Sequence, residues 1–248
     1  MSDLFLFQLR RVGRNKQYLF FTVLLPALFT IFFTKVFGGQ ATDAAQYQGY
    51  AREYMVSMMA YGGLGAALGA TIRLAFDRSS GWLRQLRVSP IPAGTVLGVE
   101  VLVGALLVLP SLVVVALVGR FVNGIELGLG SWLALVGVLW AGSVAFVALG
   151  LLLGLLLNTQ AAGGAMGIIS VVLAALGGLW VPVAVFPATM ADIAHGLPSY
   201  WYAQLGRDVV GGAAPSMTAV LVVAAFTVVF AGLALVTARR RPLHAVAG

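Results

Sequence analysis

The chain has 248 residues, of which 60% are hydrophobic and 9% are charged, against roughly 25% charged in an ordinary soluble domain. This composition excludes a water-soluble globular protein. The net charge is +7, but the basic residues are dispersed between apolar blocks, which argues against nucleic-acid binding. The absence of cysteine excludes disulfides and thiolate nucleophiles, and two histidines far apart in sequence argue against a zinc site.

Six apolar runs are long enough to cross the bilayer core, which needs about 20 residues of helix. Lipid-embedded backbone must satisfy its own hydrogen bonds, and uninterrupted runs of this length do so as helices. The sequence therefore predicts an all-α, polytopic membrane protein, a single six-span domain over residues 1–248. The predicted spans are Gln17–Phe37, Glu53–Ala75, Val96–Val118, Trp132–Leu157, Gly164–Ala184 and Met217–Ala238.

The basic residues predict the orientation of these spans, because cytoplasmic flanks are enriched in Lys and Arg. With the N-terminus inside, eleven Lys and Arg fall on the cytoplasmic side and only Lys35, Arg52, Arg120 and Arg207 on the other. We therefore expect a multi-pass protein of the plasma (inner) membrane with both termini cytoplasmic.

Residues 1–16 are predicted to form an amphipathic helix along the inner membrane surface. Ser2 and Asp3 can cap it, and Phe5, Leu9 and Val12 share one face. The first apolar run that follows has about 21 residues, which is longer than the 7 to 15 of a signal-peptide core. We therefore interpret it as a span.

The middles of the predicted spans carry no ionisable residue. Lys35 and Glu100 lie near span ends, where they can extend toward headgroups. A proton- or sodium-driven carrier normally needs a titratable group at mid-depth. The phosphate-binding pattern G-x-x-x-x-G-K-[ST] is also absent, because the two lysines follow Asn15 and Thr34. Any energy source for transport is therefore expected in another chain.

Three pairs of glycines have the G-x-x-x-G spacing that lets helices approach closely. They are Gly65 with Gly69, Gly150 with Gly154, and Gly163 with Gly167. The sequence favours packing within the bundle over a subunit interface and leaves both open.

Residues 77–92 are predicted to form a cytoplasmic loop with its own helical pattern. Ser79 or Ser80 can cap a short helix, which Pro90 and Pro92 would stop. In this helix Trp82, Leu83 and Leu86 would turn toward the membrane or a partner, with Arg84, Gln85 and Arg87 toward water. The pattern fits equally a docking site for a partner and a basic loop held by anionic headgroups.

Residues 185–215 are predicted to form a re-entrant or interfacial helical hairpin. Thr189 with Asp192 resembles a capping pair for a first helix, and Ser199 can cap a second that runs to Gly211. Tyr200, Trp201 and Tyr202 suit the headgroup belt, and this anchoring role is favoured over substrate contact. His195 is the lone candidate for acid–base chemistry and is interpreted as a helix-end residue.

These two segments resemble the permease subunits of type 2 ATP-binding-cassette exporters, a family that includes daunorubicin-resistance permeases. The loop is similar to the family pattern acidic-x-x-x-Gly-x-Leu-x-x-Leu-x-x-Ser/Thr-Pro, and the later segment to Gly-Gly-x-x-x-Pro, Pro and Pro-x8-Arg. The loop departs from the family at Ser79, Ser80 and Arg84, where further Glu residues are common. The matching residues are Asp77, Gly81, Leu83, Leu86, Ser89 and Pro90, then Gly177, Gly178, Pro182, Pro187, Pro198 and Arg207.

The resemblance implies a coupling helix at Gly81–Val88 that docks on a separate pair of ATPase subunits, which would bind the ATP and Mg. This chain would hold no cofactor of its own. The residues expected in ATPase coupling are Asp77, Gly81, Trp82, Leu83, Arg84, Leu86, Arg87 and Pro90. The resemblance also implies an outer gate at Pro182, Phe186, Pro187, Pro198, Tyr200 and Trp201, and a second permease subunit, the same or similar.

The predicted function is ATP-driven export of an amphipathic, drug-like or lipid-like compound, without covalent chemistry in this chain. Two alternatives remain: a non-transporting membrane scaffold or sensor, and an intramembrane serine hydrolase using Ser143 or Ser170 with His195. Five residues are candidates for lining a pathway, with lipid-facing packing an equal explanation: Phe29, Phe32, Phe33, Tyr54 and Met58.

Overall fold

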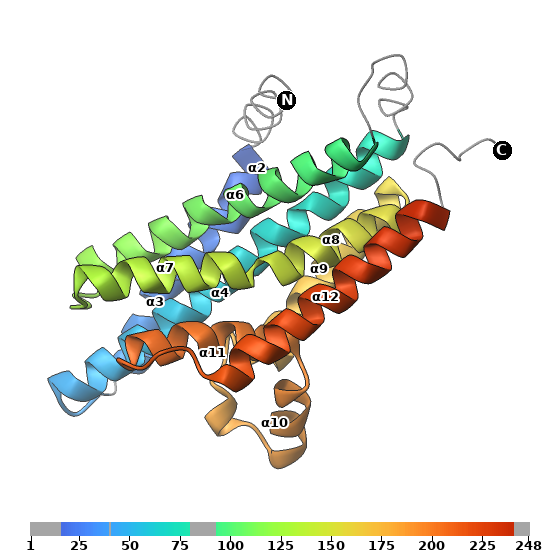
Figure 1. Ribbon diagram of the computed structural model, residues 1–248. Coiled ribbons are helices and arrows are strands. Elements are labelled where there is room, and N and C mark those ends of the chain that lie inside the picture. Colours follow the sequence, from blue (N-terminus) through green and yellow to red (C-terminus); the bar gives the residue numbers. More distant parts are fainter. Residues whose placement is uncertain (1–15, 40, 80–92, 241–248) are drawn as a thin grey trace.

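The computed structural model describes residues 16–39, 41–79 and 93–240, and this part of the chain is helical without strands. The chain runs back and forth as a bundle of antiparallel helical passes (Figure 1). The hairpin end of the bundle carries α10 (Ala188–His195) and α11 (Pro198–Val210). The opposite end is where α2 (Lys16–Leu19) begins and α12 (Met217–Arg240) ends.

Five helices in the described residues are long and apolar enough to cross a membrane. Four are α4 (Ala44–Ser79), α6 (Ala93–Phe121), α9 (Thr159–Leu176) and α12. The remaining one joins α7 (Leu129–Gly142) and α8 (Val144–Leu156) through Ser143, whose backbone stays helical with φ −64° and ψ −18°. The all-helical, multi-pass prediction is confirmed.

The first apolar run differs from the other five. Its apolar part, Phe20–Val36, is shorter than a full span. It is built from α2, a π-helical turn η1 (Phe20–Leu24) and α3 (Leu25–Gly38). The π-helical turn lies just before Leu25 and Pro26. Pro26 has no N–H and cannot donate to the Thr22 carbonyl four residues back. The Leu25 N–H donates to the Phe20 carbonyl, five residues back, which makes this turn wider than an α-helical one.

The predicted fifth span, Gly164–Ala184, has the wrong bounds. Its helix starts earlier, where the Asn158 side chain accepts a hydrogen bond from the Ala161 N–H (2.8 Å) and caps α9. It ends at Leu176, because Gly178 adopts φ +73°, a left-handed conformation that breaks the helix. A short 3-10 turn η3 (Val183–Val185) leads from there to α10.

The helix α4 is the centre of the bundle. It packs against α3, α6, α8, α9 and α11, and its apolar stretch is 87% buried, compared with 17% for α9 and for α12. Gly62 and Gly63 lie midway along it. A Cβ on Gly62 would meet the Ser111 hydroxyl on α6, Pro26 on α3 and the Thr22 carbonyl in η1, so these elements pack closely on α4 at this glycine.

The two helices expected within residues 185–215 are present as α10 and α11, but their predicted caps are wrong. Pro187 precedes α10 and Leu197 precedes α11, neither with a side-chain cap, and Pro198 occupies the first turn of α11. Ser199 donates instead to the Leu173 carbonyl of α9 (2.7 Å). A long-range acceptor has therefore replaced the local cap that the sequence indicated.

Candidate functional site

The helix α11 inserts its buried face into the hairpin end of the bundle. Tyr202, Leu205, Gly206 and Val209 are buried along this face, and α11 packs on α4, α7 and α12. A Cβ on Gly206 would lie 2.7 Å from Val56 Cγ1 on α4 and 3.2 Å from Leu135 Cδ1 on α7. Only a glycine permits this approach, which brings the neighbouring Arg207 against the central helix.

Arg207 joins three parts of the chain at this end. Its Nη2 donates to the Ser57 hydroxyl on α4 (3.3 Å) and to the Gly178 carbonyl in the turn after α9 (3.2 Å). The guanidinium lies 5.9 Å from the centre of the Tyr200 ring, within the range of a cation–π contact. Nε is buried without a hydrogen-bond partner.

Burial lowers the pKa of Arg207 from its ordinary value, because desolvation disfavours the cation. The negative charge of Glu53 opposes this effect, with smaller contributions from Tyr200 and Asp208. An arginine still keeps its proton under these conditions. The site is therefore a partly desolvated cation held between α4, α11 and the turn after α9.

Tyr202 lies in the core, on the buried face of α11. Its ring centre is 5.2 Å from that of Phe146, and its side chain packs where Gly63 and Gly142 have no Cβ. The hydroxyl is buried without a hydrogen-bond partner, and burial raises the pKa of Tyr202. The predicted headgroup-belt role is therefore wrong for Tyr202.

The other two aromatic residues of the triplet are half-buried at the hairpin. Trp201 Nε1 donates to the His195 carbonyl (2.7 Å), and the Tyr200 ring packs edge-on against His195 at 4.6 Å. Of the remaining predicted gate residues, Pro198 is buried, Pro182 and Phe186 are half-buried, and Pro187 is exposed. They belong to one hairpin, but their role in a gate stays a prediction.

The candidate pathway residues divide into two groups. The rings of Phe33 and Tyr54 are stacked with their centres 5.7 Å apart, and the ring centres of Phe29 and Phe32 lie 5.6 and 5.4 Å from that of Phe33, so these four form one aromatic cluster between α3 and α4. Met58 is buried in the core, whereas Phe32 is 57% exposed on the outside of the bundle. Glu100, expected to extend toward the headgroups, is instead buried on α6, with 2% of its surface exposed.

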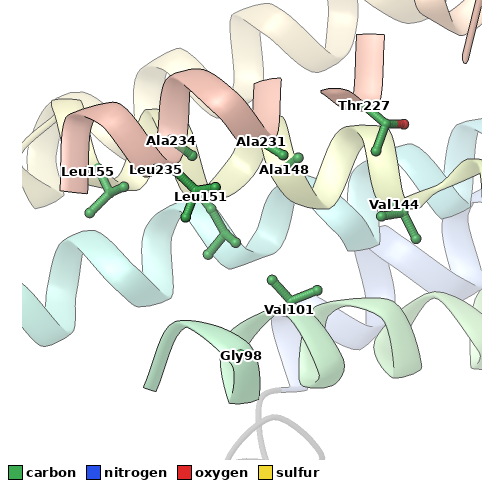
Figure 2. A pocket seen from close by; sticks show the side chains of 10 residues that line it. All are labelled: Gly98, Val101, Val144, Ala148, Leu151, Leu155, Thr227, Ala231, Ala234 and Leu235. Atoms are coloured by element: carbon green, nitrogen blue, oxygen red, sulfur yellow. The ribbon is translucent and has the colours of Figure 1, made fainter. Parts of the chain in front are cut away.

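A cavity of about 310 Å³ opens between α6, α8 and α12, at the opposite end from the hairpin. Figure 2 shows α12 on one side, α6 on the other and α8 behind them. The lining is aliphatic apart from Thr227, whose hydroxyl donates to the Val223 carbonyl (2.8 Å). The lining residues are Gly98, Val101, Val144, Ala148, Leu151, Leu155, Thr227, Ala231, Ala234 and Leu235.

The predicted ATPase-coupling residues lie outside the described residues, apart from Asp77 in the last turn of α4. The predicted N-terminal helix also lies largely outside them. The coupling role therefore stays a prediction for Gly81, Trp82, Leu83, Arg84, Leu86, Arg87 and Pro90.

The structure does not bring together the serine–histidine pair of the hydrolase alternative. Ser143 donates to the Trp140 carbonyl (2.6 Å), and the Ser170 hydroxyl is buried without a partner. His195 is exposed beside Tyr200 and Trp201. Within the described ranges, no group of three His, Cys, Asp or Glu side chains could hold a metal ion.

The sequence identified Arg207 only as a match to the Pro-x8-Arg pattern and did not place it among the gate residues, although a second signal was available. Arg207 is the only Lys or Arg between Arg120 and Arg239, and such an isolated charge in an apolar chain calls for a partner. Ser57 carried no signal, because it lies 150 residues away in sequence.

Comparison with known proteins agrees with this architecture. The family model described as ABC-2 type transporter matches residues 4–211, which include both predicted motif segments. The chain is also 29% identical over 226 residues to "Putative transport permease YvfS" of Bacillus subtilis (strain 168), covering 90% of each chain. The resemblance stated from the two segments is confirmed: this multi-pass membrane chain is a transport permease that belongs to the ABC-2 type transporter family.

Proposed function

We propose that this chain is the permease half of an ATP-driven exporter that moves an amphipathic, drug-like or lipid-like compound outward. The observation that supports this most is the family match over residues 4–211, since permeases of this family usually work with a separate ATPase subunit. In this proposal ATP and Mg bind to the partner, and this chain does no covalent chemistry. We expect its activity to resemble that of the daunorubicin-resistance permeases.

The proposed permease has six spans, with the helix that includes η1 as the first, in one domain over residues 1–248. Both termini then face the cytoplasm of the plasma membrane, because this arrangement places eleven Lys and Arg inside and four outside. The loop over residues 77–92 lies inside, where an ATPase can reach it, and the hairpin over residues 185–215 lies outside.

A second permease subunit, the same or similar, completes the proposed pathway. The support comes from α9, where Gly163, Gly164 and Gly167 are exposed and a Cβ on any of them would meet nothing within 4 Å. Such a face lets another helix approach closely. Of the glycine pairs, Gly163 with Gly167 is therefore available to a second subunit rather than used inside this bundle.

The outer gate in this proposal is the hairpin, which Arg207 holds against α4 and the turn after α9. Because Nη2 bonds to both α4 and the turn after α9, an outward movement of α11 must break charged hydrogen bonds, each stabilising by about 1.5–3 kcal/mol. Closure of the ATPase pair would push the coupling loop, which follows the far end of α4, and would tilt α4. Because Ser57 lies on α4, this tilt would break its hydrogen bond with Arg207.

Co-purification tests the partnership. The full chain is isolated from its native membranes, and ATPase subunits that remain bound are identified by mass spectrometry. Arg84→Glu with Arg87→Glu, or deletion of residues 82–86, is expected to abolish ATPase binding. Arg14→Glu with Lys16→Glu, which makes the same charge change on the same predicted side, is expected to retain it.

Transport is measured with inverted membrane vesicles and doxorubicin or a fluorescently labelled phospholipid as probes. Uptake should require ATP and should be lost in the Arg84→Glu, Arg87→Glu variant. ATPase binding retained in that variant would overturn the role of the loop. Movement of a probe by the purified chain alone, driven by a proton or sodium gradient, would overturn the proposed function.

A further inference from the structure

The cavity between α6, α8 and α12 has the length of one membrane leaflet. It follows α8 from Val144 to Leu155, which is eleven helical steps or about 16 Å at 1.5 Å per step. Half of the bilayer core is about 15 Å. Val144 lies near the middle of the span Leu129–Leu156 and Leu155 at its end, so the cavity runs from mid-membrane to the surface.

The lining of the cavity excludes water as its occupant. A buried water needs two to four polar partners, and the one polar side chain in the lining, Thr227, has its hydroxyl bonded to Val223. An empty cavity would forfeit dispersion contacts along its walls. A volume of about 310 Å³ accommodates about ten methylene groups if each takes roughly the 30 Å³ of a water molecule.

Positive charge marks the surface end of the cavity. Arg239 follows Leu235 by one turn of α12 on the same side of the helix, and its side chain is exposed. Arg240 and Arg241 come next in the sequence. Basic residues at this depth attract anionic headgroups rather than neutral ones.

We propose that this cavity is a binding site for an anionic phospholipid, with one acyl chain between α6 and α12 and the phosphate at Arg239. Glycine and alanine form the space: Gly98, Ala148, Ala231 and Ala234 each contribute little side chain. Thr227 lies at the mid-membrane end of the chain and Leu155 and Leu235 at the surface end (Figure 2). This site depends neither on the exported compound nor on the ATPase.

The test uses the full chain in vesicles that contain phosphatidylglycerol or phosphatidylcholine with the same photoreactive group on one acyl chain. Cross-linked peptides are mapped by mass spectrometry. We expect phosphatidylglycerol to label residues 227–235 of α12 and 144–155 of α8 more strongly than phosphatidylcholine does. Equal labelling by the two lipids would overturn the proposal.

Gly98→Leu is expected to narrow the cavity, because Gly98 lines it and a Cβ there would meet nothing within 4 Å. Labelling should fall to background in this variant. Gly137→Leu is the matched control, since Gly137 on α7 is equally open but does not line the cavity. Equal labelling of the two variants would contradict an acyl chain at this position.

Arg239→Gln should lower phosphatidylglycerol labelling about fivefold and leave phosphatidylcholine labelling unchanged. Arg120→Gln, at the hairpin end, is its control and should change neither. An unchanged preference in Arg239→Gln would overturn the headgroup assignment. Leu235→Cys provides a further check in this cysteine-free chain, because its cross-linking into dimers would show that a second copy covers the cavity instead.

Discussion

Ser57 and Gly178 accept hydrogen bonds from one nitrogen of Arg207, so the loss of this guanidinium leaves two groups without their donor. Ser57 is 3% exposed, and water cannot readily replace the missing donor there. Unsatisfied buried acceptors are costly, and a hydrogen bond from a charged group stabilises by about 1.5–3 kcal/mol. The stability of the hairpin end therefore depends strongly on this one side chain.

Arg207→Gln is expected to lower the free energy of unfolding by about 2–3 kcal/mol, measured by denaturant titration in detergent micelles. Arg207→Lys should lose part of this stability, because an ammonium keeps the charge but not the fork of donors. Arg120→Gln is the control, since Arg120 is exposed and makes one long bond to the Ile125 carbonyl (3.4 Å). Equal losses of unfolding free energy for Arg207→Gln and Arg120→Gln would show that the hydrogen bonds of Arg207 to Ser57 and Gly178 do not stabilise this end of the bundle.

At the scale of elements, the crossing at Gly62 permits a direct test. Gly62→Ala should destabilise the bundle by about 1–3 kcal/mol, because its Cβ would lie 3.1 Å from Pro26 Cγ and 3.2 Å from the Thr22 carbonyl. Gly65→Ala, three residues along the same helix, meets nothing within 4 Å and should stabilise by about 0.5–1 kcal/mol through helix propensity. Thermal unfolding of the two variants measures the difference, and losses of similar size would refute the close crossing.

Most elements were predictable because one local property determines each of them. Apolar runs of spanning length predicted α4, α6, α7 with α8, and α12, since lipid permits only self-satisfied helices. Proline and glycine punctuation predicted α10 and α11. The end of α9 was predicted wrongly, because the apolar run of 21 residues continues past Gly178, where the backbone is left-handed.

The remaining errors come from contacts between distant parts of the chain. Serine is a common helix-capping residue, but the hydroxyl of Ser199 donates to the Leu173 carbonyl of α9. Tyrosine is a residue type that often lies at the headgroups, yet Gly63 and Gly142 leave room for the Tyr202 side chain in the core. The partners of Arg207 lie 150 and 29 residues away, beyond any local pattern.

For the whole molecule, the number of membrane crossings depends on the first apolar segment. The segment Phe20–Val36 is shorter than the other apolar helices, and α2, η1 and α3 together connect the two ends of the bundle (Figure 1). Because the chain has no cysteine, each single-cysteine variant carries one reactive thiol. Accessibility from the two sides of the membrane can therefore be measured position by position.

With six crossings, a membrane-impermeant maleimide applied to intact cells should label Asp43→Cys, Glu126→Cys and Thr189→Cys. Lys16→Cys, Gln160→Cys and Arg239→Cys should react only after permeabilisation. All six positions are exposed in the structure. Labelling of Lys16→Cys and Asp43→Cys from the same side would show that the first helix does not cross.

Asp208, next to Arg207, ties α11 to the last helix of the bundle. Its Oδ2 accepts from the Ser216 N–H (2.7 Å) just before α12, its Oδ1 accepts from Gln204 (2.7 Å), and its carbonyl accepts from the Ala213 N–H (2.9 Å). The connection between the two helices therefore has little slack to take up a rotation. We therefore expect a displacement of α12 at Arg240, where this helix ends, to reach the contacts of Arg207 with α4, about 36 Å away along the 24 residues of α12.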